Sequence, residues 1–151
     1  PCRCPPHVLE RYRSRLSGPI LDRIDLHVPV PRLTPEELVC LEGRHGQSSA
    51  ELRELVTTAR EAQRARWKKE GFRSNAEVPE RLVRSALHLS RDVRPFLSQA
   101  VRNIRLSGRG ISRVLKVART VADIRQGEEV EVQDVCEALA YRGGGVETER
   151  P

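Results

Sequence analysis

The chain has 151 residues, about the length of one domain, which excludes a large enzyme with separate nucleotide and substrate domains. Its formal net charge of +6, with 27 Lys and Arg against 21 Asp and Glu, favours a polyanionic partner such as nucleic acid or a nucleotide. Aromatic residues make up only 3%, so there is no aromatic ladder for stacking bases, and phosphates are the expected contacts.

The first part of the chain predicts a helix followed by a strand. Apolar residues recur at helical spacing from His7 to Leu16, Ser17-Gly18-Pro19 ends that helix, and Ile20 to Ile24 makes one further turn. Asp25 to Val30 alternates between apolar and polar residues, and its prolines indicate an edge strand. Arg23 lies at this corner, where a planar guanidinium can reach out of its own subunit and match phosphate oxygens.

Two helices are expected next. The first starts after Thr34 and ends by Gly43, and the second, the longest, starts at Ser48-Ser49 and runs to about Gly71. The apolar face of the longer helix contains Leu52, Leu55, Val56, Ala59 and Ala62. Beside it runs a basic stripe, which consists of Arg53, Arg60, Arg64 and Lys68. The stripe fits contacts with nucleic-acid phosphates, and a solvated face balanced by nearby glutamates fits equally well.

Four more helices complete the chain. We expect them at Glu80–Leu87, from Ser90 to about Ile104, from Ser107 to about Gly127, and after Val130-Glu131 as far as Arg142. The last helix should point Val132, Val135, Cys136 and Leu139 inward. A glycine-rich polar tail over residues 143–151 should be disordered.

The start of the third of these helices is a candidate anion site. Ser107 and the small residues beside it leave backbone amides at the helix N-terminus, which attracts negative charge. Arg109 sits in that first turn, where the helix dipole disfavours a cation, and a bound anion would explain its place there. An ordinary surface arginine is the alternative, and the motif alone does not separate the two.

The cysteines suggest two different roles. Cys40 and Cys136 fall on apolar helix faces and are expected to be buried hydrophobic residues. Cys2 and Cys4 resemble half of a metal site, with His7 the other candidate ligand nearby. The chain has no glycine-rich loop with lysine and serine or threonine, so it cannot hold a nucleotide by a P-loop. With no membrane-length apolar run and no leader-like segment, we expect a cytoplasmic protein without a membrane partner.

Four motifs in consistent order resemble a single family. They are Cys-x-Cys-Pro-Pro, Tyr12 to Asp25 with its Leu-Asp-Arg-Ile-Asp sequence, Ser48-Ser49-Ala50-Glu51, and Leu106 to Asp123. Together they are similar to the magnesium-chelatase-like AAA+ ATPases of the ComM type, which are associated with bacterial natural transformation. The resemblance runs from residue 2 to about Arg142. It implies the C-terminal part of a longer protein, without the protease-like domain and without the nucleotide-binding core that carries Walker A and B.

The resemblance also implies an architecture and roles for individual residues. The fold would be mainly α, with residues 1–33 a remnant of the AAA+ core and residues 34–142 a helical lid. Arg23 would be the arginine finger, acting on ATP and Mg²⁺ in the neighbouring subunit of a hexameric ring, and Arg109 would be the sensor 2 arginine, in cis or in trans. Cys2 and Cys4 would be the second half of a four-cysteine zinc cluster.

Three functions remain open at this point. The resemblance favours a ring-forming ATPase that remodels DNA as a branch-migration helicase, of which this chain alone should be inactive. A free-standing basic helical module that binds nucleic acid is the second. A motor subunit of a chelatase complex that inserts a metal is the third, because its phosphate-sensing chemistry would be the same.

Overall fold

A computed structural model of the chain describes residues 4–15, 20, 23–39, 46–104 and 106–143. The described part is mainly helical, as the sequence predicts. In chain order its elements are α1 (Pro6–Ser14), α3 (Pro35–Val39), α4 (Ser49–Arg66), the 3-10 turn η1 (Asn75–Glu77), α5 (Glu80–Ala86), α6 (Val93–Ile104), α7 (Gly108–Ile124) and α8 (Val132–Gly143).

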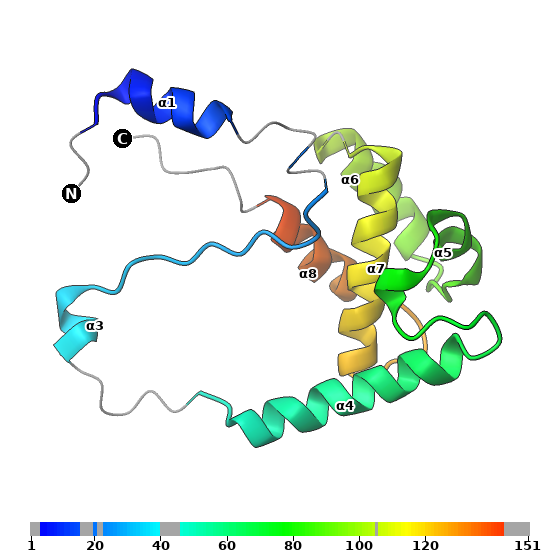
Figure 1. Cartoon of the computed structure of the whole chain (residues 1–151). Coiled ribbons are helices and arrows are strands. Elements are labelled where there is room, and N and C mark those ends of the chain that lie inside the picture. Colours follow the sequence, from blue (N-terminus) through cyan, green and yellow to red (C-terminus); the bar gives the residue numbers. More distant parts are fainter. Residues whose placement is uncertain (1–3, 16–19, 21–22, 40–45, 105, 144–151) are drawn as a thin grey trace.

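Helix α7 is the centre of a helical bundle, and α4, η1, α5 and α8 all pack against it. Figure 1 shows α4 lying across one end of α7, while α1 and α3 stand apart from the bundle. Apolar residues at helical spacing explain why α7 is central. Val114, Leu115, Ala118 and Ala122 are buried on one side of it, and they meet Trp67, Val83, Val93 and Val135 from the surrounding elements. The mainly α, lid-type fold expected from the sequence is therefore confirmed.

Side-chain caps fix where the helices of the bundle begin. Ser48 and Glu51 form a capping box at the start of α4, and the Ser107 hydroxyl accepts a hydrogen bond from the Gly110 N–H at the start of α7. Helix α8, for which the sequence offers no serine or threonine cap, uses Asp134, whose carboxylate accepts from the Glu131 N–H at 2.8 Å. An acidic side chain inside the first turn thus replaces the missing cap.

The prediction that α6 starts at Ser90 is wrong by about a turn. The Ser90 N–H donates to the Val130 carbonyl, and the Val130 N–H donates to the His88 carbonyl, so Leu89 and Val130 form an isolated parallel bridge. This pairing holds the backbone extended before α6 begins at Val93.

The strand predicted over Asp25–Val30 does not form. In the described part of the chain no neighbouring strand pairs with it, and it runs as extended backbone with Leu26, Val28 and Val30 exposed. An alternating pattern gives a strand only when another backbone satisfies its hydrogen bonds.

Predictions for two helices also need correction. Helix α4 ends at Arg66, not near Gly71, so Lys68 lies in the turn that follows; Leu52 and Val56 are exposed although Ala59 is buried. Cys136 is exposed on α8, so the prediction that it is a buried hydrophobic residue is wrong. It lies about 100° around the helix from Val135, beyond the buried stripe. Cys40 lies outside the described residues.

None of the helices described by the structure combines the length and apolar character needed to cross a membrane.

Candidate functional site

Arg109 lies in the first turn of α7, where the sequence predicts an anion-sensing residue. Helices α4, α5 and α8 each carry an acidic residue in the first turn, which complements the helix dipole, whereas α1, α6 and α7 carry none. The Arg109 side chain is 49% exposed, and its Nε lies 4.0 Å from Oε1 of Glu80. This ion pair is long and solvated, so it restrains the guanidinium weakly and leaves it able to meet an anion.

The segment around Arg23 is docked on the same helix, one turn further along. Arg113 donates a hydrogen bond to the Arg23 carbonyl at 2.5 Å and also bonds to the Asp25 carboxylate. The Arg113 side chain is mostly buried beneath this contact, at 17% exposure. Arg113 thus links the Asp25 carboxylate to the backbone of Arg23.

Helix α8 holds the other side of the segment. The His27 N–H donates to the Tyr141 carbonyl at 2.7 Å, and Arg142 donates to the Ile24 carbonyl at 3.4 Å. The backbone of the corner is thus attached to two helices, while the Arg23 side chain is exposed. Such an arrangement fixes the backbone position of Arg23 and leaves its guanidinium group exposed to solvent, where it can contact a ligand.

These contacts bring the two predicted phosphate-sensing arginines to one end of α7. Arg109 and Arg113 are four residues apart, a rise of about 6 Å along the helix. Because Arg113 bonds directly to the backbone of Arg23, the two candidate residues, 86 positions apart in the chain, lie on neighbouring turns of one surface. Two exposed guanidinium groups so placed can contact one polyanion together.

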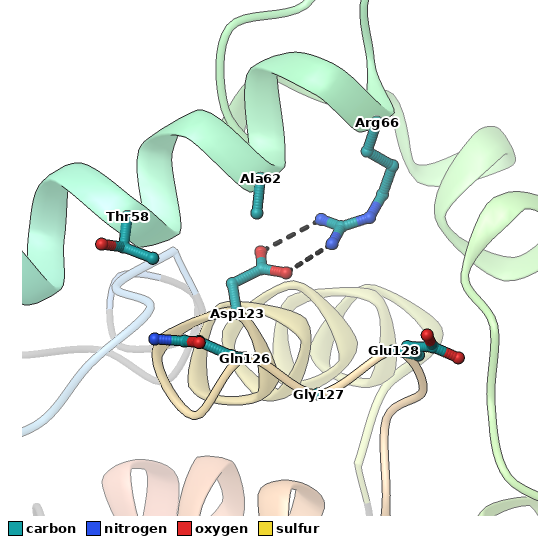
Figure 2. A pocket seen from close by; sticks show the side chains of 7 residues that line it. All are labelled: Thr58, Ala62, Arg66, Asp123, Gln126, Gly127 and Glu128. Carbon is teal, nitrogen blue, oxygen red and sulfur yellow. Dashed lines mark hydrogen bonds and ion pairs between the residues drawn. The ribbon is translucent and has the colours of Figure 1, made fainter.

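Sequence reasoning missed a buried ionic cluster at the opposite end of α7. The Asp123 carboxylate, whose side chain is fully buried, accepts hydrogen bonds from Arg66 of α4, from Arg119 one turn earlier in α7, and from Asn75 of η1. Figure 2 shows the Asp123 side chain pointing up from α7 toward Arg66 on α4. The cluster therefore ties three elements to one carboxylate.

The rest of the cluster is also paired. Asn75 Oδ1 accepts from Trp67 Nε1 at 2.9 Å, and Arg119 donates to the carbonyls of Gly127 and Glu128 beyond the helix end. Burial lowers the pKa of Arg119 while the charge of Asp123 raises it, and the net shift is downward. The sequence does contain a signal for the Arg119–Asp123 ion pair, because the two residues are four positions apart and fall among the buried positions of α7.

A cavity of about 260 Å³ adjoins this cluster, between α4 and the loop after α7. Figure 2 shows its lining, with Thr58 and Ala62 on α4 facing Gln126, Gly127 and Glu128. Arg66 and Asp123, two of the three charged residues that line it, bond to each other, and the third, Glu128, is exposed. The cluster is thus a structural clamp, since its donors and acceptors are used within the fold.

Comparison with known proteins identifies the family of the chain. Residues 46–142 match the family described as magnesium chelatase, subunit ChlI C-terminal, and residues 1–38 match magnesium chelatase, subunit ChlI. The chain belongs to the magnesium chelatase ChlI family. This membership supports an AAA+ ATPase-related role.

The chain is also similar to several longer proteins, and three of these show the identity and the coverage of the match. It is 37% identical over 144 residues to an uncharacterised protein of Mycobacterium tuberculosis, covering 95% of this chain and 28% of that protein. It is 38% identical over 140 residues to the uncharacterised protein YifB of Salmonella typhimurium, covering 93% of this chain and 27% of YifB. It is 37% identical over 140 residues to competence protein ComM of Haemophilus influenzae, covering 93% and 26%. The magnesium chelatase-type chain thus spans about a quarter of the length of these relatives.

The basic stripe on α4 lies away from the surface that carries Arg23 and Arg109. Arg53, Arg60 and Arg64 fall within about 40° of one another on α4 and are exposed. Lys68 is exposed in the turn beyond the helix. None of the carboxylates placed by the structure forms an ion pair with these four side chains. Helix α4 packs at the Asp123 end of α7, about 20 Å along that helix from Arg109.

The predicted zinc ligands are not assembled in the described residues. Cys4 is exposed, and Cys2 lies outside the part of the chain that the structure describes. Among the described residues no group of three or more His, Cys, Asp or Glu side chains is placed to hold a metal ion.

Proposed function

We propose that this chain supplies two phosphate-sensing arginines, Arg23 as arginine finger and Arg109 as sensor 2, to a ring-forming AAA+ ATPase that remodels DNA. The observation that carries the proposal is the bond from Arg113 to the Arg23 carbonyl, which keeps both arginines at one end of α7. Membership of the magnesium chelatase family and the similarity to a competence protein support it.

The two side chains fit the phosphate end of ATP. When bound with Mg²⁺, ATP supplies the phosphoryl group whose transfer the ring uses. Arg23, exposed on a fixed backbone, stabilises charge that develops on that group, an effect of about 10³ to 10⁵ in rate for arginine fingers. Arg109, at the N-terminal end of α7, orients and holds phosphate oxygens with help from the helix dipole.

Both arginines act on the same nucleotide, which belongs to the neighbouring subunit. An arginine finger acts in trans, on a nucleotide bound by a neighbouring subunit. Arg113 holds the backbone of Arg23 about one turn of α7 away from Arg109. A subunit that presents Arg23 to its neighbour therefore presents Arg109 to the same neighbour. We therefore propose that Arg109, as sensor 2, also acts in trans.

The first test uses the full-length protein that contains this chain. Arg23→Ala should lower kcat for ATP hydrolysis by about 10³-fold or more while nucleotide affinity changes little, because the finger acts mainly on the transition state. Arg91→Gln, on an exposed residue away from the arginine pair, is the matched control and should leave kcat unchanged. A normal kcat in Arg23→Ala would contradict the finger role.

Mixed rings test whether sensor 2 acts in trans. A subunit with Arg109→Ala is mixed with one defective in Walker B. If Arg109 serves the neighbour, sites with an intact Walker B receive an intact arginine from the other subunit and hydrolysis recovers. If Arg109 serves its own site, every site is defective and activity stays lost. Rings mixed from Arg23→Ala and Arg109→Ala subunits give the converse outcome, with no recovery when both act in trans.

The exposed stripe on α4 favours DNA as the partner of the ring. Arg53, Arg60 and Arg64 form no ion pair with a carboxylate among the described residues, so their guanidinium groups can contact phosphates. Replacing all three by glutamine should flatten the slope of log Kd against log salt by about 2 to 3. An unchanged slope would show that DNA binds elsewhere.

The same stripe is also the basis of the second candidate function, a basic module that binds nucleic acid without ATP chemistry. Stimulation of ATP hydrolysis by DNA distinguishes the motor from that module, and also from a chelatase motor, whose hydrolysis should respond to its metal-insertion partner. The chain alone should bind DNA weakly and hydrolyse no ATP.

A further inference from the structure

A groove of about 570 Å³ runs between α5, α6 and α7. It is separate from the arginine pair, because Ile111 and Leu115 of its lining lie nearly opposite Arg109 and Arg113 at about 100° per residue of α7. The groove combines an aliphatic floor with a basic rim. The floor consists of Leu89, Leu97, Val101, Ile111 and Leu115, and the rim of Arg84, Arg94 and Arg102.

The floor belongs partly to the core and partly to the surface. Leu97 and Leu115 are 8% and 3% exposed, whereas Leu89, Val101 and Ile111 are only half-buried. The half-buried side chains present apolar area at the base of a concave surface. Covering that area with aliphatic side chains would be favourable by about 25 cal/mol for each Å² removed from water.

The rim arginines form no ion pair with a carboxylate in the part of the chain that the structure describes. Ion pairs in the described part of the chain involve Arg66, Arg91, Arg109, Arg113, Arg119 and Arg125. Arg94 and Arg102 are exposed and have no such partner there, and Arg84 donates to the Gly108 carbonyl at 3.0 Å instead of to an acid. The fold thus leaves three cations around an apolar floor.

The spacing on α6 defines what could fill the groove. Arg94, Leu97, Ser98, Val101 and Arg102 recur at three and four residues and form one face of the helix. The two arginines bracket the apolar part and are eight residues apart, about 12 Å. A second helix with leucines at three- and four-residue spacing and carboxylates about two turns apart matches that length and charge pattern.

From this complementarity we infer that the groove docks an acidic amphipathic helix of a separate protein partner. Carboxylates on the partner pair with Arg94 and Arg102, and its aliphatic side chains cover Val101 and Ile111. Nucleic acid fits the groove less well, because no aromatic side chain lines it for base stacking, whereas its aliphatic floor suits leucine-type side chains.

The test measures binding of a fluorescein-labelled peptide to the 151-residue chain by fluorescence anisotropy. The probe is a helical peptide of about 18 residues with leucines along one face and glutamates flanking them. The control peptide, its match, has the same sequence with every glutamate replaced by glutamine. We expect the acidic peptide to bind about tenfold tighter than its match. Equal affinity for the two peptides would overturn the proposal.

Variants then locate the binding. Arg94→Gln/Arg102→Gln should weaken the acidic peptide about tenfold, whereas Arg53→Gln/Arg60→Gln, with the same change in net charge, should have less than about a twofold effect. All four residues are exposed, so circular dichroism should show an unchanged fold. Equal losses in the two variants would mean that net charge alone attracts the peptide.

Two further outcomes would contradict the choice of partner. Single-stranded DNA of about 20 nucleotides should not displace the peptide; if it does, and its own binding depends on Arg94 and Arg102, the groove is a nucleic-acid site. The full-length protein should bind the peptide as the chain does. If it does not, a segment of the same protein occupies the groove.

Discussion

The bundle of residues 46–142 and the N-terminal arm of residues 4–39 differ in where their valines lie. In the bundle Val93, Val114, Val130 and Val135 are fully buried, whereas in the arm Val28 and Val30 are 62% and 87% exposed. Local sequence explains the contrast. Helices satisfy their backbone hydrogen bonds within themselves and need only a neighbour for one face, but an extended segment needs another backbone to pair with.

The bundle therefore completes its own core, and the arm does not. In the described part of the chain, residues 23–27 of the arm meet α7 and α8 through Arg113, Tyr141 and Arg142. Val28, Val30 and Val39 of the arm are exposed. Substitutions should accordingly have large effects in the bundle and small ones in the arm.

The largest effect is expected at the ionic cluster that joins α4 and η1 to α7. Asp123→Asn removes the charge that Arg119 and Arg66 share and leaves a buried guanidinium without its counterion. The free energy of unfolding should fall by about 3 to 5 kcal/mol, measured by urea denaturation. Glu128→Gln, on an exposed side chain that lines the neighbouring cavity, is the control. A loss below about 1 kcal/mol, the size of an exposed pair, would show that the cluster does not hold the bundle together.

A matched pair of valine substitutions tests the comparison directly. Val114→Ala removes two buried methyl groups from the centre of α7 and should cost about 2 to 3 kcal/mol, including the cavity it leaves. Val30→Ala makes the same chemical change in the arm and should stay within about 0.5 kcal/mol. Similar losses at the two sites, measured by thermal and urea unfolding, would mean that the arm packs against the core.

A smaller effect, with a defined pH dependence, is expected at the start of α8. Burial alone would raise the pKa of Asp134, but hydrogen bonds from Arg125 and from the Glu131 N–H outweigh it and hold the pKa below its usual 3.8. The carboxylate therefore stabilises the fold above about pH 4, and that contribution is lost as pH falls through the lowered pKa.

Asp134→Asn should cost about 1.5 kcal/mol at neutral pH, because it weakens the charged hydrogen bonds from Arg125. The difference between the two proteins should shrink as pH falls below about 4 and through the lowered pKa of Asp134, since the wild-type carboxylate becomes protonated there. A difference that is constant over this range in urea unfolding would contradict the proposed role of the charge.

Much of the bundle could be predicted from its sequence, because helix signals are local. Periodic apolar residues and the caps at Ser48 and Ser107 gave the helices and most of their starts. The failures occurred where distant residues decide the outcome. Ser90 pairs with Val130 instead of capping α6, and the segment at Asp25–Val30 alternates like a strand but finds no strand partner in the described residues.

The candidate site divides in the same way. Arg23 and Arg109 could be chosen from motifs, but nothing in the sequence indicates that Arg113 holds them at one end of α7. The Arg119–Asp123 pair was readable as charges among buried positions, whereas its third partner, Arg66, is 57 positions away. Local spacing reveals a pair within one helix and is silent about contacts between helices.

The smallest effect on stability, and the sharpest on local structure, is expected at the attachment of the arm. Arg113→Gln removes the ion pair with the half-exposed Asp25 side chain and weakens the hydrogen bond to the Arg23 carbonyl. Global stability should change by less than about 1 kcal/mol. Amide hydrogen exchange over residues 23–30 should nevertheless become faster, while exchange in α7 and α8 stays unchanged, because local opening has its own free energy. Asp25→Asn should give the same local result, and Lys116→Gln, which removes a neighbouring cation bonded to the Ala76 carbonyl, should not. If exchange over residues 23–30 is as slow in Arg113→Gln as in the wild type, Arg23 is held by contacts other than α7, and the link between finger and sensor is lost.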